Sequence, residues 1–305
     1  MYRNIVVGYD GSAQADDALA LAQQLRDPDG GRLILTAVAP LASGVLLSSP
    51  DAHVQNLRDE ALLELQHAAT KLRPDTPHEL VPVGETSPAR GLHRVAEEHD
   101  ADLIVLGSTH RRRASVLAGR ATVQRLMHGA PCAVAVAAPG QEWRFSAKPR
   151  LCVAYDASPE ARAALDAAYR IARQLDGSVE VLRVRDALLP AFALTPAAAS
   201  VPDDESSRRQ AQAEVDEAAG RSPSEVVAFG RVLDGGAISA LLAAAQEADL
   251  LVTGSRAYGP LHRVLAGSTS IGLLTDGHVP VLVTPRLRSD HHLDAATETA
   301  GSATG

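Results

Sequence analysis

The sequence predicts an α/β fold of two doubly wound domains, each a five-stranded parallel sheet with helices on both faces. Residues 101–108 (ADLIVLGS) recur as residues 248–255 (ADLLVTGS), and IVVGYDGS at 5–12 recurs as LCVAYDAS at 151–158. Two matches at nearly the same offset indicate an internal duplication. Strand-like and helix-like segments alternate along the 305 residues. The strand-like segments are continuously apolar, which is typical of parallel sheets buried on both faces.

The first copy contains five expected strands, at 4–9, 32–38, 79–83, 102–106 and 132–137. The expected helices lie at 12–26, 51–72 and 87–98, with a last one that ends near 128. Pro88 stands at a first helical position, where the missing amide hydrogen costs nothing.

The second copy repeats this order. Its expected strands are 150–155, 178–184, 225–229, 249–253 and 279–284, and its expected helices are 158–174, 204–219, 236–247 and 267–276. We therefore expect domains at 1–140 and 150–287, joined by a linker at 141–149. The Ala/Pro/Ser-rich segment 188–207 has little to pack with, and the tail 288–305 lacks apolar periodicity, so we expect the first to be mobile and the second disordered.

Composition narrows the class of protein. A formal net charge of −8 and 3% aromatic residues disfavour a nucleic-acid binder, which needs a basic face. We find no apolar stretch of about 18 residues for a membrane span and no signal peptide. Cys132 and Cys152 are too few for a disulfide framework, so we interpret both as core thiols and expect a cytoplasmic protein.

Ligands of open parallel sheets bind beyond the carboxyl ends of the strands, where the strand order reverses. Asp10 and Asp156 each follow the first strand of a copy, and a carboxylate there can face a polar ligand. Ser12 and Ser158 follow two residues later. For these serines, capping of the next helix is an equally simple explanation.

After the fourth strand of the second copy, Gly254 begins a loop that leads to Gly267-Ser268-Thr269-Ser270. Glycine lets a phosphate approach the backbone, and a helix N-terminus with free N–H groups attracts anions. The cluster therefore predicts a phosphate site. The alternative is a capped helix after a flexible loop.

At these positions both copies resemble universal stress protein (UspA-type) domains. The resemblance rests on a G-x2-G-x9-G-[ST] pattern after the fourth strand, the first-strand Asp, and the closing strands APCAVAV and HVPVLV. It covers about residues 1–285. It implies a five-stranded parallel sheet of order 3-2-1-4-5 and, for some members, ATP binding at the loop after strand 4.

Residue by residue, the resemblance implies that Asp156 meets the ribose and Val184 lines the adenine pocket. Gly254, Gly267 and Ser268 match the pattern, whereas Ala257 replaces its second glycine. The implied second-copy site comprises Tyr155, Asp156, Val184, Thr253, Gly254, Ala257, Gly267, Ser268, Thr269 and Ser270.

The first copy departs further from the pattern. Gly107 matches, but His110 replaces the second glycine, and Arg120-Ala121 occupies the final Gly-Ser position. Asp10, Val38 and Gly107 therefore form a weaker implied site. The basic run 111–113 either holds an anion by charge or forms a solvated loop.

We find no Walker lysine, nucleophile elbow or metal-ligand cluster, so we expect no enzyme beyond slow, incidental ATP hydrolysis. The expected function is a stress sensor or regulator that binds ATP, with or without Mg²⁺, in its second domain. A scaffold protein that binds no nucleotide is the alternative. The weakest hypothesis is an enzyme of the wider adenine-nucleotide hydrolase group. The sequence shows no catalytic constellation, and fold alone does not give function.

The last strand of each copy is apolar and lies at a sheet edge in this topology. Exposed apolar edges invite pairing, so we expect the two edges to cover each other around a pseudo-twofold axis. A homodimer of the whole chain is plausible, and the protein partner is unknown.

Overall fold

The computed structural model describes residues 1–40, 51–108, 122–140, 144–185, 204–255 and 267–285. The first half contains β1 (Asn4–Gly8), α1 (Ala13–Leu25), β2 (Arg32–Pro40), α3 (Asp51–Ala69), β3 (His78–Glu85), α4 (Pro88–Glu98), β4 (Leu103–Leu106) and β5 (Ala133–Val136). The second half contains β6 (Arg150–Ala154), α6 (Pro159–Leu175), β7 (Ser178–Arg185), α7 (Asp204–Ala219), β8 (Val227–Asp234), α8 (Ala237–Ala244), β9 (Leu250–Gly254), α9 (Ser268–Asp276) and β10 (Val281–Thr284).

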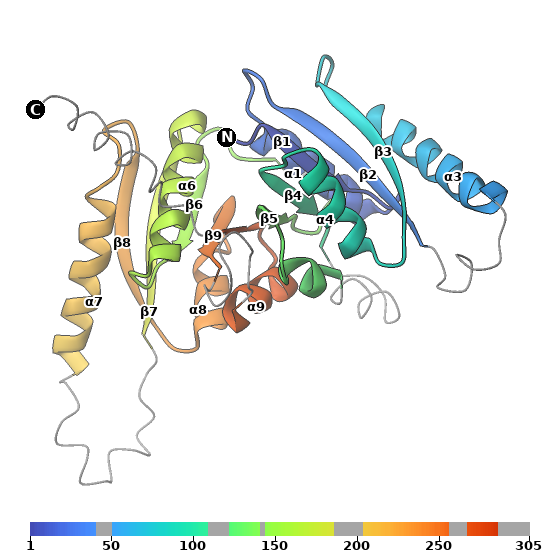
Figure 1. The fold of residues 1–305 in the computed structure, drawn as a ribbon. Helices are drawn as coiled ribbons and strands as arrows, with labels where there is room; N and C mark the ends of the chain where they lie inside the picture. The colour runs from blue at the N-terminus through green and yellow to red at the C-terminus, as the bar shows by residue number, and fades with distance from the viewer. Residues whose placement is uncertain (41–50, 109–121, 141–143, 186–203, 256–266, 286–305) are drawn as a thin grey trace, which may run out of the picture.

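The ten strands form a single sheet with the order β3-β2-β1-β4-β5-β10-β9-β6-β7-β8. Within each half the order is 3-2-1-4-5, as expected, and every neighbouring pair inside a half is parallel. The β3 and β8 edges lie at opposite ends of the molecule (Figure 1).

The two halves join through one antiparallel pair of strands. Val281 pairs with Val136, Leu282 with Ala135, and Val283 with Val134. All of these residues are buried. This pairing confirms that the apolar last strands cover each other. It keeps each sheet face continuous across the junction, so the pseudo-twofold axis stands perpendicular to the sheet.

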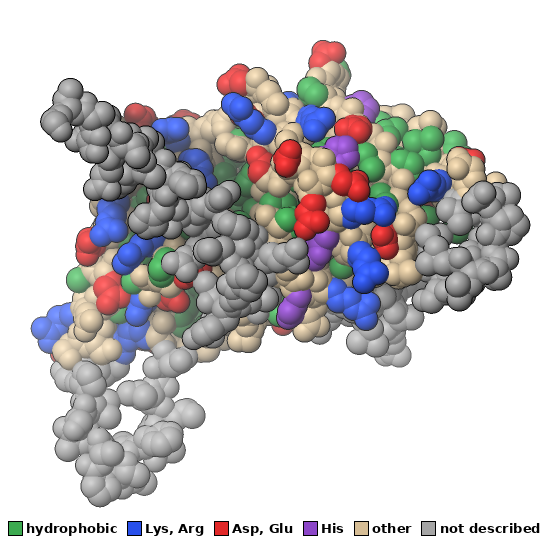
Figure 2. Space-filling model, in the orientation of Figure 1, with side chains coloured by type: hydrophobic (Ala, Val, Ile, Leu, Met, Phe, Trp, Pro, Cys, Tyr) green, Lys and Arg blue, Asp and Glu red, His purple; other side chains and the backbone are tan. Residues whose placement is uncertain are grey.

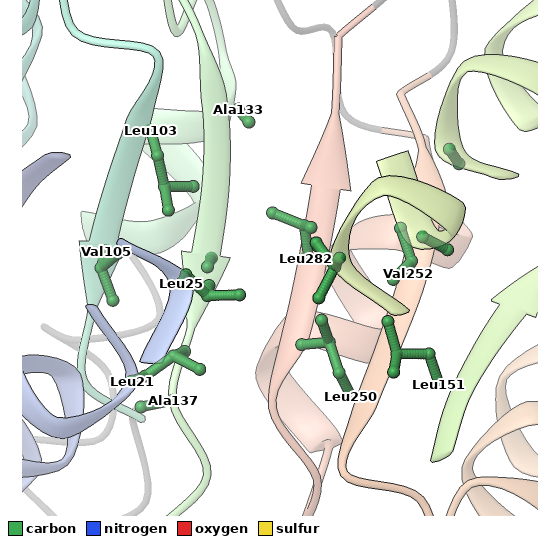
Figure 3. Close-up of a cluster of buried hydrophobic side chains, with 14 of the residues drawn as sticks. Leu21, Leu25, Leu103, Val105, Ala133, Ala137, Leu151, Leu250, Val252 and Leu282 are labelled. Atoms are coloured by element: carbon green, nitrogen blue, oxygen red, sulfur yellow. The ribbon is translucent and has the colours of Figure 1, made fainter. Parts of the chain in front are cut away.

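Helices cover both faces of this continuous sheet. One apolar core contains α1, α3, α6 and α7 side chains, and the other contains those of α4, α8, α9 and the helical residues 122–127. The first core runs across the junction, from Leu103 and Ala133 on one side to Leu282 and Val252 on the other (Figure 3). Each half is therefore a doubly wound unit that shares its core with its copy.

Most expected elements agree with the structure within two or three residues at each end, but β8 does not. The expected strand 225–229 begins too early, because β8 spans Val227–Asp234. As an edge strand it alternates between exposed and partly buried residues, so its second half lacks the continuous apolar signal of a central strand. Residues 204–207, expected to be mobile, lie in α7. The rest of that segment, from 188 to 203, and the tail 288–305 lie outside the described residues.

The segment between the halves is tied to both. The Gly140 N–H donates to Asp17 Oδ2 at 3.1 Å, and Ser146 donates through N–H and Oγ to the two carboxylate oxygens of Asp249, at 2.7 and 2.9 Å. The segment is thereby bonded to α1 of the first half and to the residue before β9 of the second. Both cysteines are buried and free, as expected.

The junction yields a test of stability. Leu282 is fully buried beside β5, so Leu282→Ala is expected to lower the free energy of unfolding by about 2–5 kcal/mol. Leu63 on α3 is 65% exposed, so Leu63→Ala is expected to change it by less than about 0.5 kcal/mol. Urea denaturation followed by circular dichroism measures both. Equal effects of the two substitutions would contradict a shared core at the junction.

Candidate functional site

Each half has a point where the strand order reverses, between β1 and β4 and between β6 and β9. Ile104 lies beside Val134, and Leu251 lies beside Val281, so the connection to the last strand has the same length in both halves. This equal length aligns Gly267 with position 120 and leaves Gly119 one position too early. Positions 109–121 and 256–266, which include His110, Arg120, Ala121 and Ala257, lie outside the described residues.

The loops after β1 and β6 begin the next helices. Ser12 Oγ accepts from the Ala15 N–H at 3.2 Å, and Ser158 Oγ accepts from the Ala161 N–H at 3.1 Å. Capping therefore explains both serines. Asp10 and Asp156 are exposed, and Oδ1 of each accepts the N–H of the serine two residues later, at 3.1 Å in both halves. Oδ2 of each aspartate has no partner among the described residues.

The residue after each of these aspartates has a left-handed backbone. Gly11 has φ of 71°, which glycine adopts freely, and Ala157 has φ of 62°. A non-glycine residue in this region is strained by about 1–2 kcal/mol. The strain in the second half therefore lies beside Asp156, at the edge where a ligand is expected.

Gly107 and Gly254 have a packing reason to be glycine. A Cβ on Gly107 would come within 2.2 Å of the Gln14 carbonyl oxygen, and one on Gly254 within 2.6 Å of the Glu160 backbone. In each half the first turn of the helix after the first strand passes directly over the end of the fourth strand. The two glycines thus bring strand and helix together, whether or not a phosphate binds there.

The start of α9 forms the core of the implied site in the second half. Gly267 is buried, occupies the N-cap, and offers no side chain to the first-turn N–H groups. Ser268 is exposed and Thr269 is half-buried. Ser270 is buried, and its Oγ donates to the Gly254 carbonyl at 3.1 Å. The hydroxyl of Ser270 thus joins α9 to β9.

Of the remaining predicted site residues of the second half, some are buried in the core and one lies near the carboxyl end of a strand. Tyr155 is 6% exposed and belongs to the core under α6 and α7, and Thr253 is equally buried. Thr253 Oγ1 donates to the Gly254 carbonyl at 3.4 Å. Val184 is half-buried near the end of β7 and packs against the other core. Tyr155 and Thr253 are thus buried, whereas half-buried Val184 lies at the expected edge.

The first half contains a cavity of about 680 Å³ at its own reversal point. It is lined from the ends of β1, β2 and β4, from α3, and from the start of α4. Asp10, Val38 and Gly107, the weaker implied site, all line it. The part that α3 plays in lining this cavity was not predicted from the sequence. In the sequence, the long helical pattern at 51–72, after the second expected strand, is the feature that could have indicated this wall of the cavity.

Helix α3 is anchored beside this cavity by a polar group at its end. Lys71 Nζ lies 2.7 Å from Asp16 Oδ1 and donates to Tyr9 Oη at 3.2 Å, and Tyr9 donates to the same Asp16 oxygen at 2.8 Å. The bond to Asp16 raises the pKa of Lys71, while desolvation raises the pKa of Tyr9. The lysine is therefore engaged in holding α3 to α1.

A buried charge cluster distinguishes the second half and was missed from the sequence. Glu180 on β7 is 2% exposed and pairs with Arg150 at 3.1 Å and with Arg231 at 2.5 Å. Cys152 Sγ lies 3.6 Å from the same carboxylate, and burial raises the pKa of this thiol to about 12. The strand register places Asn4, Val6, Ile34 and Val81 at the equivalent positions of the first half. The buried charge cluster therefore has no counterpart at the equivalent positions of the first half.

No described helix is both long and apolar enough to cross a membrane, and the described His, Cys, Asp and Glu side chains form no group of three that could hold a metal ion. On the face shown in Figure 2, basic and acidic side chains are interspersed.

The fold and its two reversal points define a tandem doubly wound α/β protein. The model of the universal stress protein family matches residues 1–138 and 149–285. The chain therefore belongs to the universal stress protein family, as the resemblance indicated.

Two solved structures of the family agree with this fold over nearly the whole chain. A universal stress protein from Archaeoglobus fulgidus DSM 4304 is 20% identical, with 93% of this chain and 96% of that chain covered and a TM-score of 0.62. A putative universal stress protein from Pseudomonas aeruginosa UCBPP-PA14 is 18% identical, with 93% of each chain covered and a TM-score of 0.59. A universal stress protein in complex with cAMP is 23% identical over 46% of this chain and 99% of its own, with a TM-score of 0.32. A search of curated proteins found no significant match.

The close approach at Gly254 yields a second test. Gly254→Ala forces the β9 end and the α6 start apart, so it is expected to lower the free energy of unfolding by about 1–3 kcal/mol. Gly30→Ala is the matched control, because a Cβ there meets nothing within 4 Å, and its effect is expected to stay within about 0.5 kcal/mol. Thermal unfolding by calorimetry compares them. A Gly254→Ala protein as stable as the control would show that the approach is not tight.

Proposed function

We propose that this universal stress protein binds an adenine nucleotide, ATP, in its second domain and acts as a sensor or regulator in a stress response. The main support for this proposal is the N-terminus of α9, which lacks a side-chain cap. Gly267 caps this helix without a side chain, beside the carboxyl end of β9, so the first-turn N–H groups receive no side-chain acceptor from the cap. Such a helix terminus attracts anions through its dipole and its N–H groups.

The neighbouring groups fit a nucleotide. Exposed Ser268 and half-buried Thr269 carry hydroxyls on the first turn of α9. The exposed carboxylate of Asp156 can accept ribose hydroxyls, and half-buried Val184 offers an apolar edge to a base. ATP binds with or without Mg²⁺ in this proposal, and a bound Mg²⁺ would neutralise phosphate charge.

The contrast between the copies supports a single nucleotide site per chain. The aligned positions are Gly267-Ser268 in the second half and Arg120-Ala121 in the first. An arginine in place of the glycine adds a bulky side chain where phosphate oxygens must approach the backbone, and alanine removes a donor.

Binding rather than catalysis is the proposed activity, with at most slow ATP hydrolysis. The proposed site of action is the cytoplasm, where nucleotide occupancy is read by a protein partner that is still unknown. A homodimer is compatible with the fold, because the β3 and β8 edges lie away from the junction.

Calorimetric titration with ATP tests the site. The double substitution Gly267→Arg with Ser268→Ala writes the first copy's residues into the second. It is expected to weaken ATP binding at least about 100-fold, because it removes hydrogen bonds to charged groups worth about 1.5–3 kcal/mol each. The intact chain is expected to bind one ATP.

The matched control is Arg120→Gly with Ala121→Ser, which changes the same aligned positions in the first half and is expected to leave the second-domain affinity unchanged. Full ATP binding by the Gly267→Arg, Ser268→Ala protein, or two equal sites in the intact chain, would refute the assignment. A folded intact chain that binds no adenine nucleotide would favour the scaffold function instead.

A further inference from the structure

The cavity of the first half differs in chemistry from the proposed nucleotide site of the second. Its walls are largely apolar, with Val38, Leu57, Leu92 and Leu106 among the lining residues. Its volume of about 680 Å³ lies within the range of about 300–1,000 Å³ that is usual for small-molecule sites. The cavity therefore has the size and the lining to enclose an apolar molecular body.

Among the described residues that line this cavity, the charged side chains are all acidic. Asp10, Glu60 and Glu64 line it, and no Lys or Arg is present among its described lining residues. Lys71, anchored to Asp16 and Tyr9, is not one of the lining residues. An anionic ligand would face three carboxylates, whereas a cation would be attracted by each of them.

A buried hydroxyl adds an observation that does not depend on the carboxylates. Ser108, directly after β4, lines the cavity and is 8% exposed. Its Oγ has no hydrogen-bond partner among the described residues. Buried polar atoms almost always have a partner, so an unpaired hydroxyl at a cavity wall points to a bound group that supplies one.

The carboxylates are not arranged as a metal site. Among the described residues, no three His, Cys, Asp or Glu side chains gather closely enough to hold an ion. Asp10, Glu60 and Glu64 are each exposed to solvent, although they line the cavity together with its apolar residues. This layout suits a ligand with an apolar body and a donor head that spans to the rim.

We propose that the first domain binds a small organic cation, with an apolar body between Val38 and Leu92 and an ammonium group facing Glu60, Glu64 and Asp10. Ser108 accepts or donates one hydrogen bond to the body of the ligand. The two domains of the chain then bind ligands of opposite charge. This site is independent of the nucleotide site proposed for the second domain.

The test uses three probes that share an indole ring and differ in charge: tryptamine, tryptophol and indole-3-acetate. Calorimetric titration of the intact chain is expected to show tryptamine binding about tenfold more tightly than neutral tryptophol, because of the rim carboxylates. Indole-3-acetate is expected to show no binding up to about 5 mM.

Substitutions on α3 distinguish the contribution of the carboxylate charges to binding from that of the apolar lining. Glu60→Gln with Glu64→Gln is expected to remove most of the difference between tryptamine and tryptophol while leaving tryptophol binding unchanged. Asp59→Asn is the matched control, because Asp59 is on the same helix, is exposed and does not line the cavity.

Ser108→Ala tests the hydroxyl. It is expected to weaken both tryptamine and tryptophol by about threefold to tenfold through the lost hydrogen bond, without lowering the melting temperature. An unchanged affinity for both probes would overturn the role of Ser108.

Three outcomes would overturn the proposal itself: equal binding of the three probes, preference for indole-3-acetate, or no binding of any probe. The Gly267→Arg, Ser268→Ala protein is expected to bind tryptamine as the intact chain does, and saturating ATP is expected not to displace it. Failure of nucleotide binding and failure of cation binding are therefore separate results.

Discussion

The antiparallel pairing of β5 with β10 is the constraint on which the rest of the structure depends. These two strands are the most apolar edges of their halves, and each would be exposed without the other. Pairing satisfies their backbone groups and joins two cores into continuous layers on both faces of one sheet. It also leaves β3 and β8 as the outer edges of the molecule and places one reversal point on each side of the junction.

Because each half keeps its own reversal point, the two sites have been free to diverge without loss of the shared core. The second half has a helix start with no side-chain cap at Gly267, and the first has a cavity whose lining includes Glu60 and Glu64. The interior has diverged as well. Glu180 is held between Arg150 and Arg231 where the first half has the apolar Ile34. A buried carboxylate of this kind requires both partners, since an unpaired buried charge is costly.

The architecture could be predicted from sequence because it follows from patterns that repeat: apolar strands, intervening helices and two matching segments. The roles of residues at the carboxyl ends of the strands depend on interatomic distances, which a sequence pattern does not give. Ser270 matches a phosphate-binding turn, yet its Oγ is bonded to Gly254, and Gly254 is itself required by the backbone of Glu160. The cavity depends on where α3 lies over β2 and β3. The predicted bounds of β8 were wrong because an edge strand lacks a continuous apolar run.

The central claim is that one fold, duplicated, presents two sites of opposite charge preference. Native mass spectrometry of the intact chain with ATP and tryptamine together tests it most directly, since it counts each ligand on each molecule. The account predicts a population that carries one ATP and one tryptamine at the same time. Chains that carry two ATP molecules, or ligands that exclude each other, would contradict it.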